Sequence, residues 1–230
     1  MAIGYRLIFC AALVLIPTQA AAQAAAPDVA PADPSRLIIG PTGRMLAPGQ
    51  GYVTFDALFV ATVQVGVTPH FSMGGGALII PIELPRPLWV TPKVQLYGSE
   101  RLNVAAGVIH MFVPGEVRTG FAYTVGTIGG REKSMTIGGG VLYADDVDDR
   151  RGPGSVLVVV IGGERRVNPS ASFLTENYLG RHGGLVTGGL RWRRGAWQLK
   201  AGGILPIVYG YFGYARPGIW FSFARGFGGH

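Results

Sequence analysis

The chain has 230 residues, of which 48% are hydrophobic and only 14% charged, with 37 glycines and a formal net charge of +7. A typical soluble domain carries about 25% charged residues, so this composition argues against an ordinary soluble fold. The length is compatible with a single domain.

Residues 1–24 have the features of a cleaved secretory signal. Arg6 precedes an apolar run from Leu7 to Pro17, and the small residues at Ala22-Gln23-Ala24 offer a cleavage site. The sequence therefore predicts export, and the sole cysteine, Cys10, would be lost with the signal. An exported chain has little access to nucleic acid, and no basic helix or recognised binding motif is present, so no nucleic-acid partner is expected.

The mature chain is predicted to begin with a flexible lead-in, residues 25–35, rich in Ala and Pro, followed by one domain, residues 36–230. No apolar run after the signal is long enough for a membrane helix, and the density of Gly and Pro disfavours helices. Apolar residues alternate with polar ones instead. Because only helices and closed barrels satisfy every backbone group in a bilayer, we expect an all-β, up-and-down antiparallel transmembrane β-barrel.

The first elements in chain order are a weak strand at Arg36–Met45 and the clearest strand, Gly51–Val67. In the second, Val, Phe and Ala occupy one parity and mostly polar residues the other, which is typical of a strand between two different solvents. The same alternation predicts strands around Val90–Tyr97 and Val186–Arg193. Pro92 weakens the first of these, because a residue without an N–H cannot donate to the ladder.

A phrase of alternating residues followed by small ones recurs along the chain. It starts at Phe71, Leu102, Met135 and Trp197, at separations of 31, 33 and 62 residues, and one unit corresponds to about one hairpin of two membrane-length strands. Short connections, among them one at Glu164–Pro169, alternate with longer ones, among them one at Leu179–Gly183, as periplasmic turns and extracellular loops do in outer-membrane barrels. We therefore expect about twelve strands, with ten as the alternative, and both chain termini in the periplasm.

The C-terminal segment resembles the last-strand signal read by the barrel assembly machinery, in which a polar residue and a glycine precede two spaced aromatics. Gly218, Phe221 and Phe223 match it, although seven residues follow the second aromatic and Phe227 offers an alternative terminus. The resemblance implies that this machinery is a partner and that the protein lies in the cell outer membrane.

Several segments in order, GPTGRMLAPGQGYV, GVTPHFSMGGG, LNVAAGV, YTVGTIGGREKSMTIGGGV and TENY, are similar to a widespread group of uncharacterised bacterial outer-membrane β-barrel proteins. The similarity covers nearly all of the mature chain. Its motifs mark turns and glycine-rich strands, so it implies fold and compartment and no reaction or ligand.

Charged residues on the inward parity are the main candidates for function. Basic side chains outnumber acidic ones there, which would favour anions if water fills the lumen. If the lumen is occluded, the same residues would pair with one another as internal struts. The lumen-facing candidates are Asp56, Lys93, Arg118, Glu176, Arg191 and Lys200.

No catalytic, cofactor or metal site is expected. His70-Phe71-Ser72 resembles the His-x-Ser pair of barrel lipid hydrolases, but parity places Ser72 in the lumen near a periplasmic turn, whereas those enzymes carry the pair on their outer surface. An acidic loop at Asp145–Asp149 could hold a divalent cation through oxygen ligands, yet it lacks EF-hand spacing and is expected to be a solvated loop.

Three functions remain in order of preference. The first is an outer-membrane barrel acting as a narrow pore or small-solute binder with a net positive lumen, in contact with outer-membrane lipid and lipopolysaccharide. The second is a non-conducting structural or surface-interaction barrel that uses the aromatic loop Ile207–Tyr214. An envelope-lipid hydrolase is third.

Overall fold

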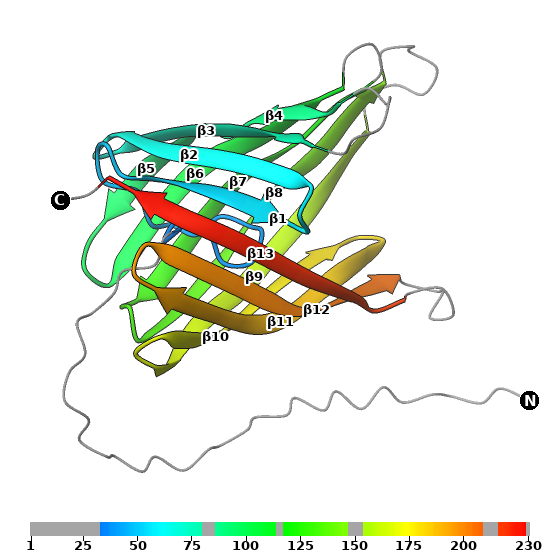
Figure 1. Ribbon diagram of the computed structural model, residues 1–230. Helices are drawn as coiled ribbons and strands as arrows, with labels where there is room; N and C mark the ends of the chain where they lie inside the picture. Colours follow the sequence, from blue (N-terminus) through cyan, green and yellow to red (C-terminus); the bar gives the residue numbers. More distant parts are fainter. Residues whose placement is uncertain (1–32, 80–85, 114–116, 147–153, 209–215, 229–230) are drawn as a thin grey trace, which may run out of the picture.

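The computed structural model describes residues 33–79, 86–113, 117–146, 154–208 and 216–228. In these residues the regular structure is one antiparallel β-sheet that closes on itself into a barrel (Figure 1). None of the described residues belongs to a helix long and apolar enough to cross a membrane. The predicted signal, residues 1–24, and most of the predicted lead-in lie outside the described residues.

The strands follow one another around the wall in chain order, and each pairs with its sequence neighbours except β4 and β5, which both pair with β3 and β6. Their bounds are β1 Gly51–Asp56, β2 Val60–Thr68, β3 Phe71–Leu78, β4 Leu88–Val90, β5 Lys93–Gly98, β6 Leu102–Phe112, β7 Val117–Gly129, β8 Lys133–Asp146, β9 Gly154–Asn168, β10 Ala171–Gly180, β11 Gly183–Arg194, β12 Trp197–Val208 and β13 Gly218–Phe227.

The barrel closes where β1 meets β13, from the pair Gly51 and Phe227 to the pair Asp56 and Ser222. β4 and β5 occupy one position in the wall, because both lie between β3 and β6. The wall therefore has twelve strands, and the predicted twelve-stranded up-and-down barrel is confirmed.

Pro92 separates β4 from β5 without disturbing their register. Val90 pairs with His110 and Lys93 with Gly107, so the same alignment continues across the interruption. The carbonyl of Pro92 still accepts a hydrogen bond from the Val108 N–H at 3.1 Å. The ladder loses only the bond that the missing N–H of Pro92 would have made.

The prediction of one strand over Gly51–Val67 is wrong, because this stretch forms the β1–β2 hairpin. Ala57 and Leu58 adopt left-handed backbone angles at its turn, with φ of 49° and 69°. Phe55 faces Ala61 across the hairpin, so odd residues pair with odd residues. Inward and outward residues therefore keep alternating through the turn, and for this reason the sequence Gly51–Val67 resembles a single long strand.

The predicted strand at Arg36–Met45 is also wrong. Its backbone makes one isolated bridge, between Arg36 and Pro41, and joins no strand of the barrel wall. The wall has one strand fewer than predicted at Arg36–Met45 and one more at Gly51–Val67. The strand count therefore agrees with the prediction although these two elements do not.

The connections form two classes at opposite ends of the barrel. We call the end with the β2–β3, β5–β6, β7–β8, β9–β10 and β11–β12 turns the short-turn end, and the opposite end the loop end. The turn predicted at Glu164–Pro169 is displaced, because Glu164 and Arg166 belong to β9 and only Pro169 and Ser170 connect it to β10. The β10–β11 connection, predicted among the longer ones, is a tight turn between Gly180 and Gly183.

The outer surface of the barrel is strongly apolar. On β13, Phe221, Phe223 and Phe227 all project outward, so the C-terminal aromatic pattern continues to Phe227. Trp197 stacks on Phe223 with ring centroids 4.9 Å apart. Other exposed outward side chains include Phe55, Val63, Val94, Leu96, Met135, Ile137, Val159, Phe173, Leu190, Trp192 and Leu199.

Candidate functional site

Residues 33–50, which we call the inner segment, lie inside the barrel rather than in its wall (Figure 1). Leu37 and Ile38 are buried in a cluster with Leu174 of β10 and Trp220 of β13. Asp33 is fully buried as well. Asp33 and Ser35, at the end of the expected lead-in 25–35, are therefore held within the barrel.

Glu176 of β10 holds the inner segment through three successive backbone N–H groups. Those of Ile38, Ile39 and Gly40 donate to its carboxylate at 2.7, 3.2 and 2.8 Å. A Cβ on Gly40 would overlap the Tyr178 hydroxyl, which itself donates to the Glu176 carboxylate. A fully buried carboxylate is thereby satisfied by charge-assisted hydrogen bonds instead of by a cation.

Two buried cations of the neighbouring strands β11 and β12 also bind the inner segment. Arg191 donates to the carbonyl of Leu37 at 3.0 Å and to the carboxylate of Glu164 at 2.7 Å. Lys200 donates to the same carbonyl at 2.7 Å and to Asp33 at 2.5 Å. These cations are therefore used to hold the inner segment and are not available to line a water-filled pore.

The structure places five of the six lumen-facing candidates inside the barrel and buries them: Asp56, Lys93, Glu176, Arg191 and Lys200. Arg118 differs from the prediction. The inward face of β7 carries Tyr123, Val125 and Thr127, which are buried odd-numbered residues, whereas Arg118 has even parity and is exposed near the loop end.

Three charged residues that lie inside the barrel were not among the residues predicted to face the lumen. Glu164 falls in the predicted turn Glu164–Pro169, Asp33 in the expected lead-in, and Arg36 at the start of the predicted strand Arg36–Met45, so none of the three was expected to face inward. Asp33 is buried against Lys200, which is 167 residues away in sequence, and Arg36 is held by Asp56, 20 residues away.

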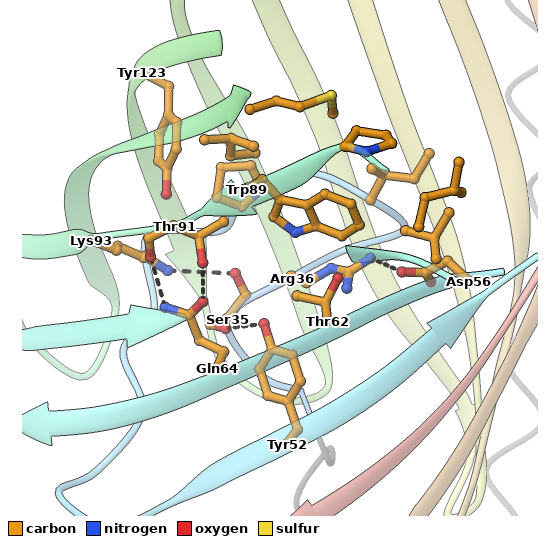
Figure 2. A pocket seen from close by; sticks show the side chains of 17 residues that line it. Ser35, Arg36, Tyr52, Asp56, Thr62, Gln64, Trp89, Thr91, Lys93 and Tyr123 are labelled. Atoms are coloured by element: carbon orange, nitrogen blue, oxygen red, sulfur yellow. Dashed lines mark hydrogen bonds and ion pairs between the residues drawn. The ribbon is translucent and has the colours of Figure 1, made fainter. Parts of the chain in front are cut away.

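A cavity of about 270 Å³ remains between the inner segment and the loop end (Figure 2). Its walls are mainly apolar and aromatic, and its floor is polar. The wall residues include Val60, Leu78, Trp89, Ile109, Met111 and Tyr123, and the polar residues include Arg36, Asp56, Gln64, Thr91 and Lys93.

At one side of the cavity, Arg36 forms an ion pair with Asp56 of β1, with Nη2 3.0 Å from Oδ2. A second guanidinium nitrogen donates to Thr54 at 3.0 Å. Burial lowers the pKa of Arg36, but the nearby Asp56, Tyr52 and Asp33 together more than offset this and raise it above its ordinary value. The pair is therefore charged and mutually neutralised.

Lys93 lies at the opposite side of the cavity from this pair (Figure 2). Its side chain is only 4% exposed, and its ammonium donates to two neutral acceptors, the carbonyls of Arg44 at 2.6 Å and of Ser35 at 3.4 Å. Within the described part of the chain, no carboxylate forms an ion pair with it. Lys93 is thus a buried cation without a countercharge.

The inward glycines do not leave the lumen empty, because neighbouring side chains occupy the space above them. A Cβ on Gly138 would lie 2.8 Å from Val125 Cγ1, and one on Gly140 would lie 2.8 Å from Phe121 Cε2. A Cβ on Gly76 would overlap the indole of Trp89, whose ring lies across it. Glycine therefore allows large inward side chains to pack within a narrow barrel.

His70 and Ser72 do not form a catalytic pair. The His70 ring is exposed and contacts Gln95, with Nδ1 3.2 Å from Oε1, whereas Ser72 is fully buried and accepts a hydrogen bond from Gln64 at 3.1 Å. Among the residues described, no group of three metal-ligating side chains could hold an ion. Most of the acidic loop and most of the aromatic loop Ile207–Tyr214 lie outside the described residues.

Comparison with known proteins adds no relative. No protein-family model matches the chain, and no curated protein matches it. The resemblance to an outer-membrane barrel family therefore stays a prediction, and the fold is established as a twelve-stranded antiparallel barrel.

Proposed function

We propose that this protein is an integral outer-membrane barrel that is closed to ion flow and binds a small solute in the cavity at its loop end. One observation carries the proposal: the inner segment occupies much of the barrel interior but leaves a mainly apolar cavity with charged residues on its floor, toward the loop end. Cavities of this kind, with few polar groups among apolar walls, are typical of ligand sites.

The outer surface supports the membrane location. Large apolar side chains project outward all around the wall, while charged and polar ones are buried inside, and this reversal of the soluble pattern is typical of outer-membrane barrels. The signal at residues 1–24 would deliver the chain to the periplasm. Gly218, Phe221 and Phe223 would then present the last strand to the barrel assembly machinery, and the apolar wall would contact outer-membrane lipid and lipopolysaccharide.

The closed interior favours a solute binder over the open pore that a positive lumen would allow. Arg191 and Lys200, which would give such a pore its anion preference, are bonded to the inner segment. A non-conducting structural barrel is the second candidate. Binding of a solute in the cavity distinguishes the two.

Membrane location is tested by fractionation. We expect the mature protein in the outer-membrane fraction, with a gel mobility that changes on boiling, because a closed barrel resists detergent until heated. In planar bilayers the folded protein should insert without forming channels. Recovery as a soluble periplasmic protein would contradict the membrane assignment, and steady conductance of the unmodified protein would contradict the closed state.

A further inference from the structure

The charges around the cavity do not balance. Arg36 and Asp56 neutralise each other at one side, and Lys93, when protonated, adds one positive charge at the other. Burying a charge is costly unless it is paired, and the two backbone carbonyls that Lys93 contacts supply hydrogen bonds but no negative charge. An anion entering the cavity would provide the missing countercharge.

A second polar group accompanies Lys93. The Tyr123 hydroxyl makes no hydrogen bond with the described residues and points toward Lys93 (Figure 2). Gly107, which pairs with Lys93 across the β5–β6 ladder, makes room for it, since a Cβ there would lie 2.5 Å from the Tyr123 hydroxyl oxygen. An ammonium and a phenol hydroxyl at one place form a suitable pair of donors for a carboxylate.

The walls above this pair are apolar. Along β6 toward the loop end, Ile109 and Met111 follow Gly107 on the inward face, and Trp89 lies opposite them on β4. The volume of about 270 Å³ lies just below the usual range for drug-sized ligands, roughly 300–1,000 Å³. The ligand is therefore a small molecule with an apolar body and one anionic end.

From this geometry we infer that the cavity binds a small monocarboxylate with an apolar or single-ring body, its carboxylate on Lys93 and Tyr123 and its body against Trp89 and Met111, which lie side by side on β4 and β6. The inference rests on the proposed solute-binding function and specifies its ligand class. Charge selects the ligand, and the apolar walls supply most of the contact area.

The test measures binding by calorimetry to the full mature protein in nanodiscs of uncharged lipid. Phenylpropionate, phenylpropanol and phenylpropylamine share one body and differ in charge. We expect phenylpropionate to bind at least about tenfold more tightly than the alcohol, equivalent to about 1.4 kcal/mol, and the amine to bind weakest. This comparison uses the unmodified protein and does not depend on the folding of any variant.

Variants then locate the site. Lys93→Gln should abolish the preference for the acid, and Tyr123→Phe, which removes only an unbonded hydroxyl, should weaken phenylpropionate roughly tenfold. Lys133→Gln, at an exposed position on the short-turn end, is the matched control and should bind as the unmodified protein does. Heat-modifiable mobility verifies that each variant is folded.

The outcomes test the carboxylate ligand class separately from the solute-binding function. Equal binding of all three probes, with no effect of Lys93→Gln, would overturn the carboxylate inference and leave the solute site standing. Binding of none of the probes to the folded barrel would overturn the solute-binding function itself.

Discussion

Changing Glu176 to alanine is expected to release the inner segment and convert a closed barrel into a conducting one. The carboxylate accepts the N–H groups of Ile38, Ile39 and Gly40, and each buried donor left without a partner costs about 1–3 kcal/mol. The barrel wall keeps its backbone ladder, because the side chain of Glu176 takes no part in it. Single-channel recording in planar bilayers measures the result.

A second variant should open the barrel through a substitution in the inner segment itself. A side chain at Gly43 would collide with the backbone of Asn103, since even a Cβ would lie 2.7 Å from its carbonyl carbon. Gly43→Val should therefore displace the segment without altering any strand. Both variants should also become cleavable by trypsin at Arg44.

The control for both is Glu100→Ala, which removes an exposed carboxylate on the short-turn end. It should remain closed and protected. If Glu176→Ala and Gly43→Val gave folded barrels that neither conduct nor expose Arg44, the inner segment would not be the element that closes the lumen.

The opened channel should prefer anions. Once the inner segment leaves, Lys93, Arg191 and Lys200 face the lumen without the carbonyls that they contact in the closed barrel. Rings of like charge set pore selectivity, and the preference should weaken in strong salt, where the screening length falls to about 3 Å at 1 M. Reversal potentials in a salt gradient measure it, and a cation preference would contradict the assignment of these charges.

A lysine at Val63 is expected to impair membrane assembly, whereas one at the neighbouring Thr62 is not. Val63 projects outward from β2 and is 41% exposed, while Thr62 lines the interior cavity. A lysine on the lipid face near the bilayer midplane costs about 2–4 kcal/mol. At Thr62 the ammonium can instead extend through the cavity toward the loop end.

The measurement is the folded fraction of each variant in lipid vesicles across a urea series, read from heat-modifiable mobility. Val63→Thr is the matched control, because it keeps the shape of the side chain and adds no charge. Equal loss of folding for both lysine variants would show that β2 does not separate lipid from lumen. Thr54 is unsuitable as an inward control, because it is fully buried and bonded to Arg36.

The sequence by itself determined which face of most strands points inward. Alternation is a local property of an extended chain, so Lys93 and Arg191 could be assigned to the interior without knowing their partners. It also indicated the order of pairing, because consecutive strands in an up-and-down barrel pair through their connections, whereas the count of twelve came out right only because two errors cancelled.

Only the tertiary structure decided what fills the barrel. The inner segment has no alternation to reveal its environment, and Ile38 reaches Glu176 across 138 residues. Parity was equally unable to show that Gly51–Val67 turns back on itself, since the β1–β2 register pairs odd residues with odd ones. A local pattern records which solvent a side chain meets, whereas the closed lumen and its cavity depend on contacts between segments that only folding brings together.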